Sequence, residues 1–295
     1  MADVLFEKVA FIGIGLIGSS MARRMAADGL VSEIVACARS EETRSKAVDL
    51  GIASQTFEDP AAAVDGADLV VIATPIGSYG AIAQVIAPAL KPGAIVTDVG
   101  SVKQAVVDAV TPHLGAENIF VPGHPIAGTE ESGPEAGFPE LFEGRWTILT
   151  PTGDTEADAA EKVKVLWQQM GAMVDIMTPS HHDMVLAITS HLPHLIAYTI
   201  VGTATDLEDD LRQEVVKYSA SGFRDFTRIA ASDPVMWRDI FLNNQDATLE
   251  TLQRFSEDLT ALQRAIRRGE GDALEDLFAR TRKIRRGIID AKQAD

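Results

Sequence analysis

The chain has 295 residues, of which 46% are hydrophobic and 23% charged, values typical of a globular protein with one large domain or two ordinary ones. Its formal net charge of −17 argues against general affinity for nucleic acid, and a small anionic substrate would need a local cluster of arginine or lysine. The single cysteine, Cys37, excludes an internal disulfide. Because the first segment is unlike a signal peptide and no apolar run is expected to reach bilayer length, we expect a cytoplasmic protein that does not enter a membrane.

The first half of the chain alternates short apolar runs with helical patterns. The apolar runs predict strands at 8–15, 33–38, 67–75, 93–100 and 118–123. The stretches between them predict helices at 16–29, 39–51, 81–90 and 101–114. Two further strands, at 145–151 and 172–177, flank a helix near 156–170. This alternation predicts right-handed βαβ units and a mostly parallel sheet.

The alternation stops after about residue 177. The segment from Ser180 is long, apolar and helical in period, and the chain from Asp233 is helical almost to its end, with a break near Gly269 and Gly271. We therefore predict an α/β domain over 1–177 and an all-α domain over 178–295.

A glycine motif follows the first predicted strand. The sequence GIGLIG places Gly13, Gly15 and Gly18 around Leu16 and Ile17, between a strand and a helix. The first glycine allows a tight turn, the second lets a pyrophosphate approach the backbone, and the third lets the helix pack closely on the strand. This context predicts dinucleotide binding in a Rossmann-type domain, the alternative being a merely structural turn. Thr74 and Pro75, which end the third strand, are expected beside the cofactor at the same edge.

The position that contacts the ribose carries no acid. In NAD-binding proteins an Asp or Glu about 20 residues after the glycines accepts the 2′-hydroxyl, but here the second strand ends at Ala38, followed by Arg39 and Ser40. Arg39 would pair with the 2′-phosphate of NADP or stack on adenine, or it is a surface residue at a helix start. Ser40 is expected to cap that helix. The choice between NAD and NADP stays open.

Two polar residues follow later strands of the sheet. His124 lies in the loop VPGHPIAGTEESG, framed by glycine and proline, just after the fifth strand. A neutral imidazole there would take a proton from a hydroxyl while a hydride leaves for nicotinamide, although a loop histidine on its own is more often plain surface. Ser101, in DVGSVK, follows the fourth strand and should lie at the same edge, unless it is only a helix N-cap.

The helical half carries two further polar groups. His191 and His194, in SHLPH, are three residues apart on one helical face, which we expect to line an interdomain cleft because no partner with metal-ligand spacing accompanies them. The segment from Ser221 carries Arg224, Asp225, Arg228 and Trp237. The two arginines share a helical face and suit a carboxylate, or alternatively pair with Asp225, Asp233 or Asp239.

These pieces, in this order, resemble the prephenate/arogenate dehydrogenase family, and in particular bacterial cyclohexadienyl dehydrogenases. The matching motifs are GIGLIGSS, TDVGSVK, GHPIAGTE, SHLPH and FRDFTRIAASDPVMW, which span residues 13–237. The resemblance implies oxidative decarboxylation, in which prephenate becomes 4-hydroxyphenylpyruvate or arogenate becomes tyrosine. The missing ribose acid departs from the NAD pattern of many members.

The resemblance also implies a role for each matching residue. His124 accepts the proton of the ring hydroxyl, Ser101 hydrogen-bonds the same hydroxyl, and Arg228 holds the ring carboxylate. His191 or His194 lies toward the substrate side chain. The remaining matches are Glu130 and Asp225, near the entrance or supporting the arginine, and Trp237, lining the pocket from this subunit or the partner. The family's helical domain forms a twofold homodimer, which we expect here as well.

Two other interpretations remain at this point. A β-hydroxyacid-type dehydrogenase has a similar two-domain plan, but its catalytic lysine lies in the helical domain, where no obvious candidate stands. A dinucleotide-binding protein without turnover would not need His124, Ser101 and Arg228 together. The preference for prephenate or arogenate, and any inhibition by tyrosine, stay open.

Overall fold

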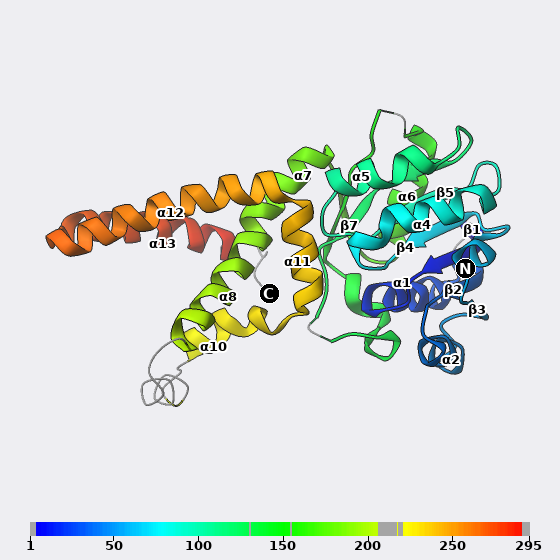
Figure 1. The fold of residues 1–295 in the computed structure, drawn as a ribbon, viewed down its shortest axis with the longest axis horizontal. Helices are drawn as coiled ribbons and strands as arrows, with labels where there is room; N and C mark the ends of the chain where they lie inside the picture. Colours follow the sequence, from blue (N-terminus) through cyan, green and yellow to red (C-terminus); the bar gives the residue numbers. More distant parts are fainter. Residues whose placement is uncertain (1–3, 130, 154, 206–216, 218–220, 291–295) are drawn as a thin grey trace. The chain divides into compact units, whose positions relative to one another are not determined.

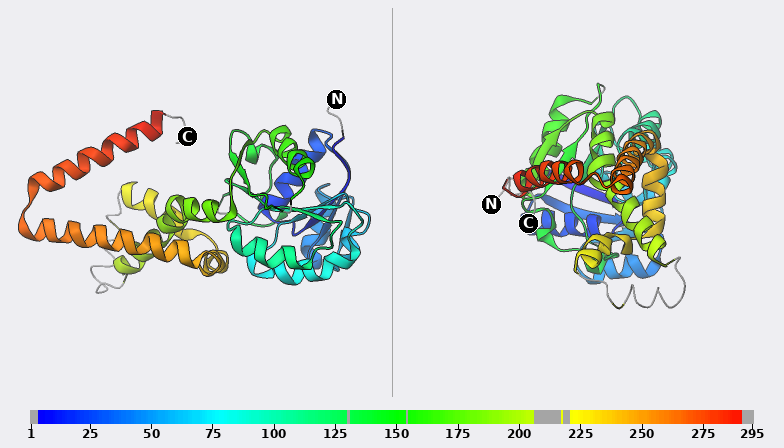
Figure 2. Two further views of the ribbon diagram at one scale, coloured as in Figure 1. Left: turned by 90° about the horizontal axis from the view of Figure 1, so that it is seen from above. Right: turned by 90° about the vertical axis from the view of Figure 1, so that its left-hand side faces the viewer.

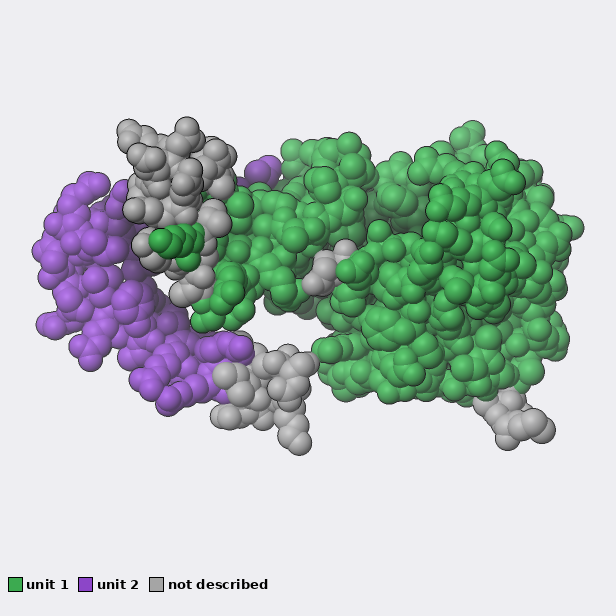
Figure 3. All heavy atoms as spheres, turned by 90° about the horizontal axis from the view of Figure 1, so that it is seen from below, with its two compact units in different colours: residues 1–245 green, residues 246–295 purple. Residues whose placement is uncertain are grey.

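The computed structural model describes residues 4–129, 131–153, 155–205, 217 and 221–290. Contacts between residues divide the chain into two compact units, Met1–Gln245 and Asp246–Asp295, coloured separately in Figure 3.

The first unit is built on a six-stranded, all-parallel sheet (Figure 1). The strand order is β3-β2-β1-β4-β5-β6. Its strands are β1 (Phe6–Ile12), β2 (Val31–Cys37), β3 (Gln55–Phe57), β4 (Leu69–Ile72), β5 (Ile95–Asp98) and β6 (Ile119–Val121). The predicted βαβ alternation is confirmed. The edge strand β3 was not predicted, because three residues are too short to show a hydrophobic period.

Helices cover both faces of this sheet. α1 (Leu16–Ala27), α2 (Glu41–Asp49) and α6 (Ala157–Gln169) cover one face, and α3 (Pro60–Val64), α4 (Tyr79–Ile86) and α5 (Gln104–Val110) cover the other. The side chains of β1 alternate between the two faces, and each face has its own hydrophobic core. Val9 and Phe11 enter the core under α1, α2 and α6, and Ala10 and Ile12 enter the core under α3, α4 and α5. All four side chains are buried, as expected for a parallel strand covered on both faces. Short 3₁₀ turns extend or connect these elements, at Ile76–Ser78, Ala87–Ala89, Thr111–His113, Pro134–Ala136 and Pro139–Phe142.

A second, three-stranded sheet follows β6. Its order is β7 (Gly123–Pro125), β8 (Trp146–Leu149) and β9 (Met173–Ile176), with β7 antiparallel to β8 and β9 parallel to it. The expectation that His124 lies in a loop is therefore wrong. Backbone bonds from Thr150 to Pro122 (2.9 Å) and from Ile126 to Trp146 (2.7 Å) extend the pairing on either side of β7, and the His124 side chain is only 8% exposed. Two prolines and a glycine hid this short strand from a propensity argument.

The helical part of the first unit begins at α7 (Pro179–Leu186). A π-helical turn (Ala187–His191) joins α7 to α8 (Leu192–Thr205), and α10 (Ser221–Thr227), a 3₁₀ turn (Arg228–Ala231) and α11 (Pro234–Asn243) follow. The run Pro179–Ala204 is long and apolar enough to cross a membrane by length and composition alone, which corrects the expectation that no run would be. That criterion is weak, and the run contains His182 and Asp183, whose side chains are buried and hydrogen-bonded within the protein.

The second unit contains helix α13 and nearly all of helix α12. α12 (Gln245–Arg268) and α13 (Gly271–Asp290) meet at Gly269, whose φ of 68° suits a helix end, and this confirms the predicted break. The two helices diverge from this turn (Figure 2). They leave large apolar side chains 49–65% exposed, at Leu259, Ile266, Phe278 and Ile284.

Candidate active site

The site residues predicted from the first half of the chain gather at one edge of the parallel sheet. Gly13 follows β1, Thr74 follows β4, Ser101 follows β5 and His124 follows β6. These strands are neighbours in the sheet and run in the same direction, so their carboxyl ends form a single edge, where open α/β sheets bind ligands.

The glycine turn has the geometry that a dinucleotide requires. Gly13 has φ +96°, and a Cβ there would lie 2.5 Å from the carbonyl oxygen of Ala73, so no side chain fits. A Cβ on Gly18 would lie 2.7 Å from the Gly13 oxygen, whereas one on Gly15 would meet nothing within 4 Å. Gly15 is the N-cap of α1, whose first turn has no acid. The turn therefore offers open space at a helix N-terminus, and its residues fit a pyrophosphate.

The neighbouring loops are held by their own side chains. Thr74 Oγ1 and Ser78 Oγ share a hydrogen bond of 2.8 Å, and Ser78 donates to the carbonyl of Pro75 (2.7 Å). Ser40 caps α2 by accepting from the Thr43 amide, as predicted. Arg39 is exposed, and its side chain forms no hydrogen bond or ion pair within the described part of the chain.

The region after β2 is fixed by a different arginine. Arg44 donates to the carbonyls of Ala38 and Arg39, both at 2.8 Å. It also forms an ion pair with the exposed Glu58 (3.3 Å). Arg44 thus orders the backbone of the loop, and the Arg39 guanidinium is left available to a ligand.

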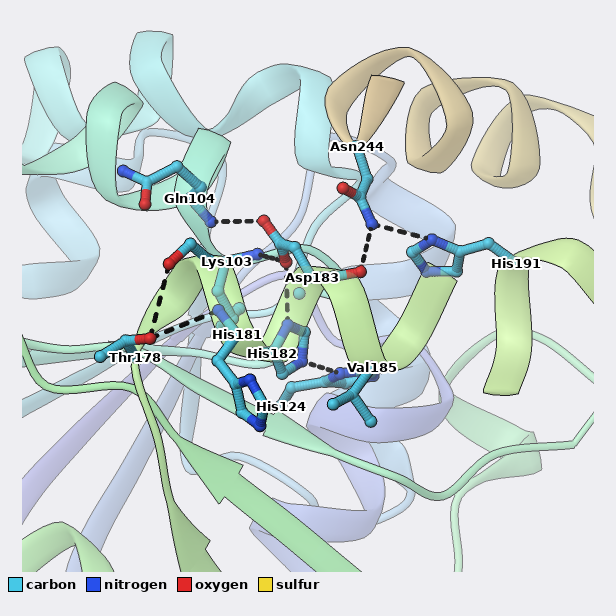
Figure 4. A network of polar contacts seen from close by, with 12 residues as sticks. Lys103, Gln104, His124, Thr178, His181, His182, Asp183, Val185, His191 and Asn244 are labelled. Atoms are coloured by element: carbon cyan, nitrogen blue, oxygen red, sulfur yellow. Dashed lines mark hydrogen bonds and ion pairs between the residues drawn. The ribbon is translucent and has the colours of Figure 1, made fainter. Parts of the chain in front are cut away.

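His124 begins a buried chain of hydrogen bonds (Figure 4). Its Nδ1 lies 2.8 Å from Nε2 of His182, and Nδ1 of His182 lies 2.8 Å from Oδ1 of Asp183. The two rings meet edge to face, with centroids 5.1 Å apart. β7 supplies the first histidine and α7 supplies the other two residues, so the contact joins two parts of the first unit that lie 58 residues apart in sequence.

The chain of contacts fixes the proton on each ring. A carboxylate can only accept, so His182 donates its Nδ1–H to Asp183 and keeps a lone pair on Nε2. That lone pair accepts the Nδ1–H of His124, which leaves Nε2 of His124 without a proton. Burial, followed by the charges of His182 and Lys103, holds the pKa of His124 well below its ordinary value. Burial likewise lowers the pKa of His182. Near pH 7 His124 is therefore a neutral base.

Asp183 also bonds to α5 and its surroundings. Its Oδ1 accepts from the Lys103 amide (2.7 Å) and its Oδ2 from the Gln104 amide (2.9 Å). The Asp183 carbonyl accepts from Asn244 Nδ2 (2.8 Å), which also lies 3.1 Å from Nδ1 of His191. The hydrogen-bonded chain of His124, His182 and Asp183, called the relay from here on, is thus bonded to the N-terminus of α5 and to the end of α11.

Ser101 lies half-buried just before these residues. α5 begins at Gln104, so Ser101 is not its N-cap, which was the alternative to a functional role. Its hydroxyl forms no hydrogen bond with any residue that the structure describes. Ser101 is therefore available to a ligand at the sheet edge.

His191 and His194 both contact the ring of Trp237, an arrangement that fits the predicted sharing of one helical face. The Trp237 ring stacks on His194 with centroids 3.6 Å apart and meets His191 edge-on at 6.1 Å. All three belong to the same chain, so the Trp237 ring does not depend on a partner subunit for these contacts. Nε1 of Trp237 and Nε2 of His191 are buried without a hydrogen-bond partner among the described residues, which is unusual for polar atoms and is compatible with a bound ligand or water there.

The predicted arginines lie beside this cluster or on the surface. Burial lowers the pKa of His194, a hydrogen bond with the Ser190 backbone opposes this effect, and the positive charge of Arg228 lowers the pKa further. Arg228 therefore lies near the His194 ring. α10 ends at Thr227, and Arg228 begins the 3₁₀ turn. The expectation that Arg224 and Arg228 lie on one face of a continuous α-helix is therefore wrong. Arg224, Asp225 and Arg228 are all exposed.

The alternative salt-bridge partners have other contacts. Asp239 pairs with Arg238 (2.6 Å), and Asp233 caps α11 by accepting from the Met236 amide. Glu130, expected near the entrance, lies outside the described residues.

His182, Asp183 and Asn244 were not predicted from the sequence to be part of the site. His182 and Asp183 follow one another in SHHDMV, a cluster of titratable residues in an apolar helix, and that was the available signal. Nothing in the sequence links this cluster to His124, because the contact is made only by folding.

Comparison with known proteins gives one consistent result. The family model "Prephenate dehydrogenase, nucleotide-binding domain" matches residues 21–176, and "Prephenate dehydrogenase, dimerization domain" matches residues 178–280. The chain is similar to the cyclohexadienyl dehydrogenase of Zymomonas mobilis, with 42% identity over 93% of each chain. It is 35% identical to the prephenate dehydrogenase of Bacillus subtilis, over 92% of this chain and 72% of that protein. The crystal structure of Aquifex aeolicus prephenate dehydrogenase with hydroxyphenyl propionate and NAD+ matches with a TM-score of 0.88 and 37% identity, covering 96% of this chain and 98% of that one.

Proposed function

The chain belongs to the prephenate dehydrogenase family, and from this premise we propose that it decarboxylates prephenate or arogenate oxidatively, with NAD(P) as hydride acceptor and His124 as base. The reaction places the protein in tyrosine biosynthesis. The observation that carries the assignment of His124 is its contact with His182 and Asp183, which leaves Nε2 as a buried, neutral acceptor.

The relay explains how His124 takes and returns one proton. As the ring hydroxyl becomes a carbonyl, its proton moves to Nε2 of His124, and the imidazolium is stabilised through His182 by the Asp183 carboxylate. The bound dinucleotide supplies the nicotinamide that accepts the hydride. When the ring carboxylate leaves as CO₂, the ring oxygen gains electrons and recovers the proton from His124 as a phenol. No net proton is released, so a buried base without a path to solvent suffices.

Ser101 is proposed as the second partner of the ring hydroxyl. It follows the neighbouring strand β5, and its hydroxyl has no partner within the described chain. A hydroxyl both donates and accepts, so Ser101 can hold the substrate oxygen before and after its proton moves.

The cluster around Trp237 is proposed to bind the rest of the substrate. Arg228 would hold the ring carboxylate, because a dianion needs a local cation in a protein of net charge −17. Of the two histidines, His194 is half-buried and near Arg228, whereas His191 is fully buried against Asn244. We therefore assign the substrate side chain to His194, and a supporting place to His191. Asp225 is kept as a residue near the entrance or supporting Arg228, and Arg224 as a second substrate contact.

The cofactor site is formed by the glycine turn and the loops beside it. The residues proposed to contact the dinucleotide are Gly13, Gly15, Leu16, Ile17, Gly18, Arg39, Ser40, Thr74 and Pro75. The exposed Arg39 and the missing acid at Ala38 favour acceptance of the NADP 2′-phosphate alongside NAD, since a charge-assisted bond is available and no carboxylate repels the phosphate.

The helical part is proposed to hold two copies of the chain together. Residues 178–280 match a dimerization domain, and α12 and α13 expose large apolar side chains. Burial of such side chains between two symmetric copies would remove them from water. We thus propose a homodimer, with 1–177 binding the nucleotide and 178–295 forming the dimer, acting in the cytoplasm.

The function is tested with purified protein, prephenate or arogenate, and each dinucleotide. The proposal expects reduced nicotinamide to appear with 4-hydroxyphenylpyruvate from prephenate, or with tyrosine from arogenate, in equal amounts. A protein that binds NAD or NADP but turns over neither substrate would contradict it.

A further inference from the structure

A buried ion pair contacts Gly123, the residue that precedes His124. Asp98, the last residue of β5, and Lys103, just before α5, have fully buried side chains, with Nζ of Lys103 2.5 Å from Oδ2 of Asp98. Lysine and aspartate are almost never fully buried unless they are paired. The base and substrate contacts proposed above do not use this pair, so its presence in the core needs another explanation.

The pair holds both polar groups of the Gly123 peptide unit. Nζ of Lys103 donates to the Gly123 carbonyl (2.6 Å), and Oδ1 of Asp98 accepts from the Gly123 amide (3.1 Å). A Cβ on Gly123 would lie 3.1 Å from the Asp98 carbonyl, so the two strands approach closely here. Gly123 immediately precedes His124, so the position of Gly123 fixes the position of the His124 backbone from which the imidazole side chain extends.

Lys103 acts on the other end of the relay as well. Its backbone amide donates to Oδ1 of Asp183, the same oxygen that accepts from His182. One residue therefore contacts the backbone next to His124 through its side chain and the carboxylate behind His182 through its amide.

We propose that Lys103, held in place by Asp98, is a positioning residue that sets the register of His124 against His182 without touching the substrate. The inference rests on the proposed role of His124 as base. A base must lie within hydrogen-bond reach of the hydroxyl, and a displacement of about 1 Å lowers the rate by about 10²-fold. The buried pair gives the short strand β7 a rigid attachment that its own three residues could not provide.

Lys103 has a second effect that a purely structural contact would lack. Its positive charge lowers the pKa of His124, after the larger effects of burial and of His182. Loss of that charge would raise this pKa towards its ordinary value. Since only the neutral imidazole is a base, the acid limb of kcat/KM for prephenate would then move to higher pH.

The test compares Lys103→Met with the double variant Asp98→Asn/Lys103→Met. The single variant leaves a buried carboxylate without its partner, which is strongly destabilising, whereas the double variant removes both charges. For both we expect a fall in kcat of about 10²-fold, with the KM for prephenate and the Kd for NAD changed by much less. The acid limb of kcat/KM should move to higher pH in the single variant, and by less in the double variant, which also loses the negative charge of Asp98.

Thr97→Val is the matched control. Thr97 is also fully buried on β5, and its hydroxyl donates to the Val121 carbonyl (2.7 Å) rather than to Gly123, His124, His182 or Asp183. This nearly isosteric change should lower the melting temperature and leave kcat and its pH dependence close to those of the wild type.

The proposal is overturned if the folded variants keep a kcat close to that of the wild type with an unmoved acid limb. It is also overturned if NAD binding and prephenate binding weaken as much as kcat falls, because that indicates general loosening. Should neither variant fold, amide exchange in the wild type decides: slow exchange at Gly123 and Lys103 supports the attachment, and fast exchange contradicts it. A wild type without prephenate turnover would instead refute the proposed function.

Discussion

The glycine turn and the histidine relay lie at the same sheet edge but are built in opposite ways. The turn uses six consecutive residues, Gly13–Gly18, and presents backbone and open space. The relay joins β7 and α7 through side chains and the segment before α5 through the backbone amide of Lys103, with contacts separated by 58 and 80 residues in sequence. Cofactor binding can therefore be built from a local motif, whereas the proposed base depends on long-range packing.

The two regions also differ in what a substitution would disturb. A change in the turn meets backbone or empty space, so its effect depends on whether a new atom fits. A change in the relay leaves buried polar atoms without partners, which typically costs about 1–3 kcal/mol for each neutral group. The experiments below test whether the two regions separate binding from chemistry as this difference implies.

The largest effect is expected at His124. His124→Asn should lower kcat by about 10²–10⁴-fold, the usual contribution of a general base, while the Kd for NAD stays unchanged. His113→Asn serves as control, since His113 is an exposed histidine on the 3₁₀ turn after α5. If His124→Asn weakened NAD binding as much as it slowed turnover, the separation between the two regions would be lost.

The glycine turn offers a matched pair of substitutions. Gly13→Ala should lower the free energy of unfolding by roughly 3 kcal/mol, because φ +96° and a 2.5 Å approach to the Ala73 carbonyl oppose a Cβ. Gly15→Ala should fold normally, because its Cβ meets nothing within 4 Å, yet it should weaken the dinucleotide by about tenfold, since the methyl group enters the space for the pyrophosphate. Urea denaturation and nucleotide titration measure the two effects, and equal stability losses would refute the assignment of open space at Gly15.

Arg228→Ala extends the comparison to the substrate. It should raise the KM for prephenate by about 10–100-fold and leave the nucleotide KM unchanged, because a bidentate carboxylate contact is lost. Arg224→Ala, at an exposed position in α10, should change KM less. A lower melting temperature with an unchanged KM would show that Arg228 serves only the fold.

Burial of His191 makes stability depend on pH. Burial lowers its pKa to about 4 from an ordinary 6.5, so between these values the unfolded chain binds a proton that the folded protein does not. Its contribution is therefore neutral above pH 6.5 and destabilising as the pH falls, on the order of 2 kcal/mol by pH 5. The difference between the urea midpoints at pH 7 and pH 5 should be smaller in His191→Asn than in the wild type. An equal pH dependence in both proteins would contradict the buried neutral state of His191.

The smallest effect is expected at Arg39. Arg39→Ala should weaken NADP by about fivefold, since an exposed charge is screened by water, and should leave NAD almost unchanged. Inhibition or turnover measurements with both dinucleotides make the comparison. The same loss for both would indicate that Arg39 stacks on adenine.

The sequence was sufficient for features that depend on neighbouring residues. The strands from β1 to β6, apart from the three-residue β3, follow from apolar runs, and the roles of Gly13 and Gly18 follow from their position between strand and helix. The position of His191 and His194 on one side fits their spacing, because residues three apart share a helical face, whereas their contact with Trp237 was not predicted.

The rest required the folded chain. The strand character of His124 depends on pairing with β8, more than 20 residues later, and the proline and glycine around it point to a loop. His182, Asp183 and the Asp98–Lys103 pair could not be assigned because their partners come from other elements. Tertiary contacts overrode local propensity at the position proposed for the catalytic base.

The central claim is that the relay leaves Nε2 of His124 as an unprotonated base. Nitrogen-15 NMR of the histidine rings in the wild type, with His124→Asn to assign the signals, measures the protonation of each ring nitrogen directly. At pH 7 the account predicts a neutral His124 with its proton on Nδ1, and protonation only below the ordinary pKa of 6.5. A cationic ring at pH 7, or a proton on Nε2, would contradict it.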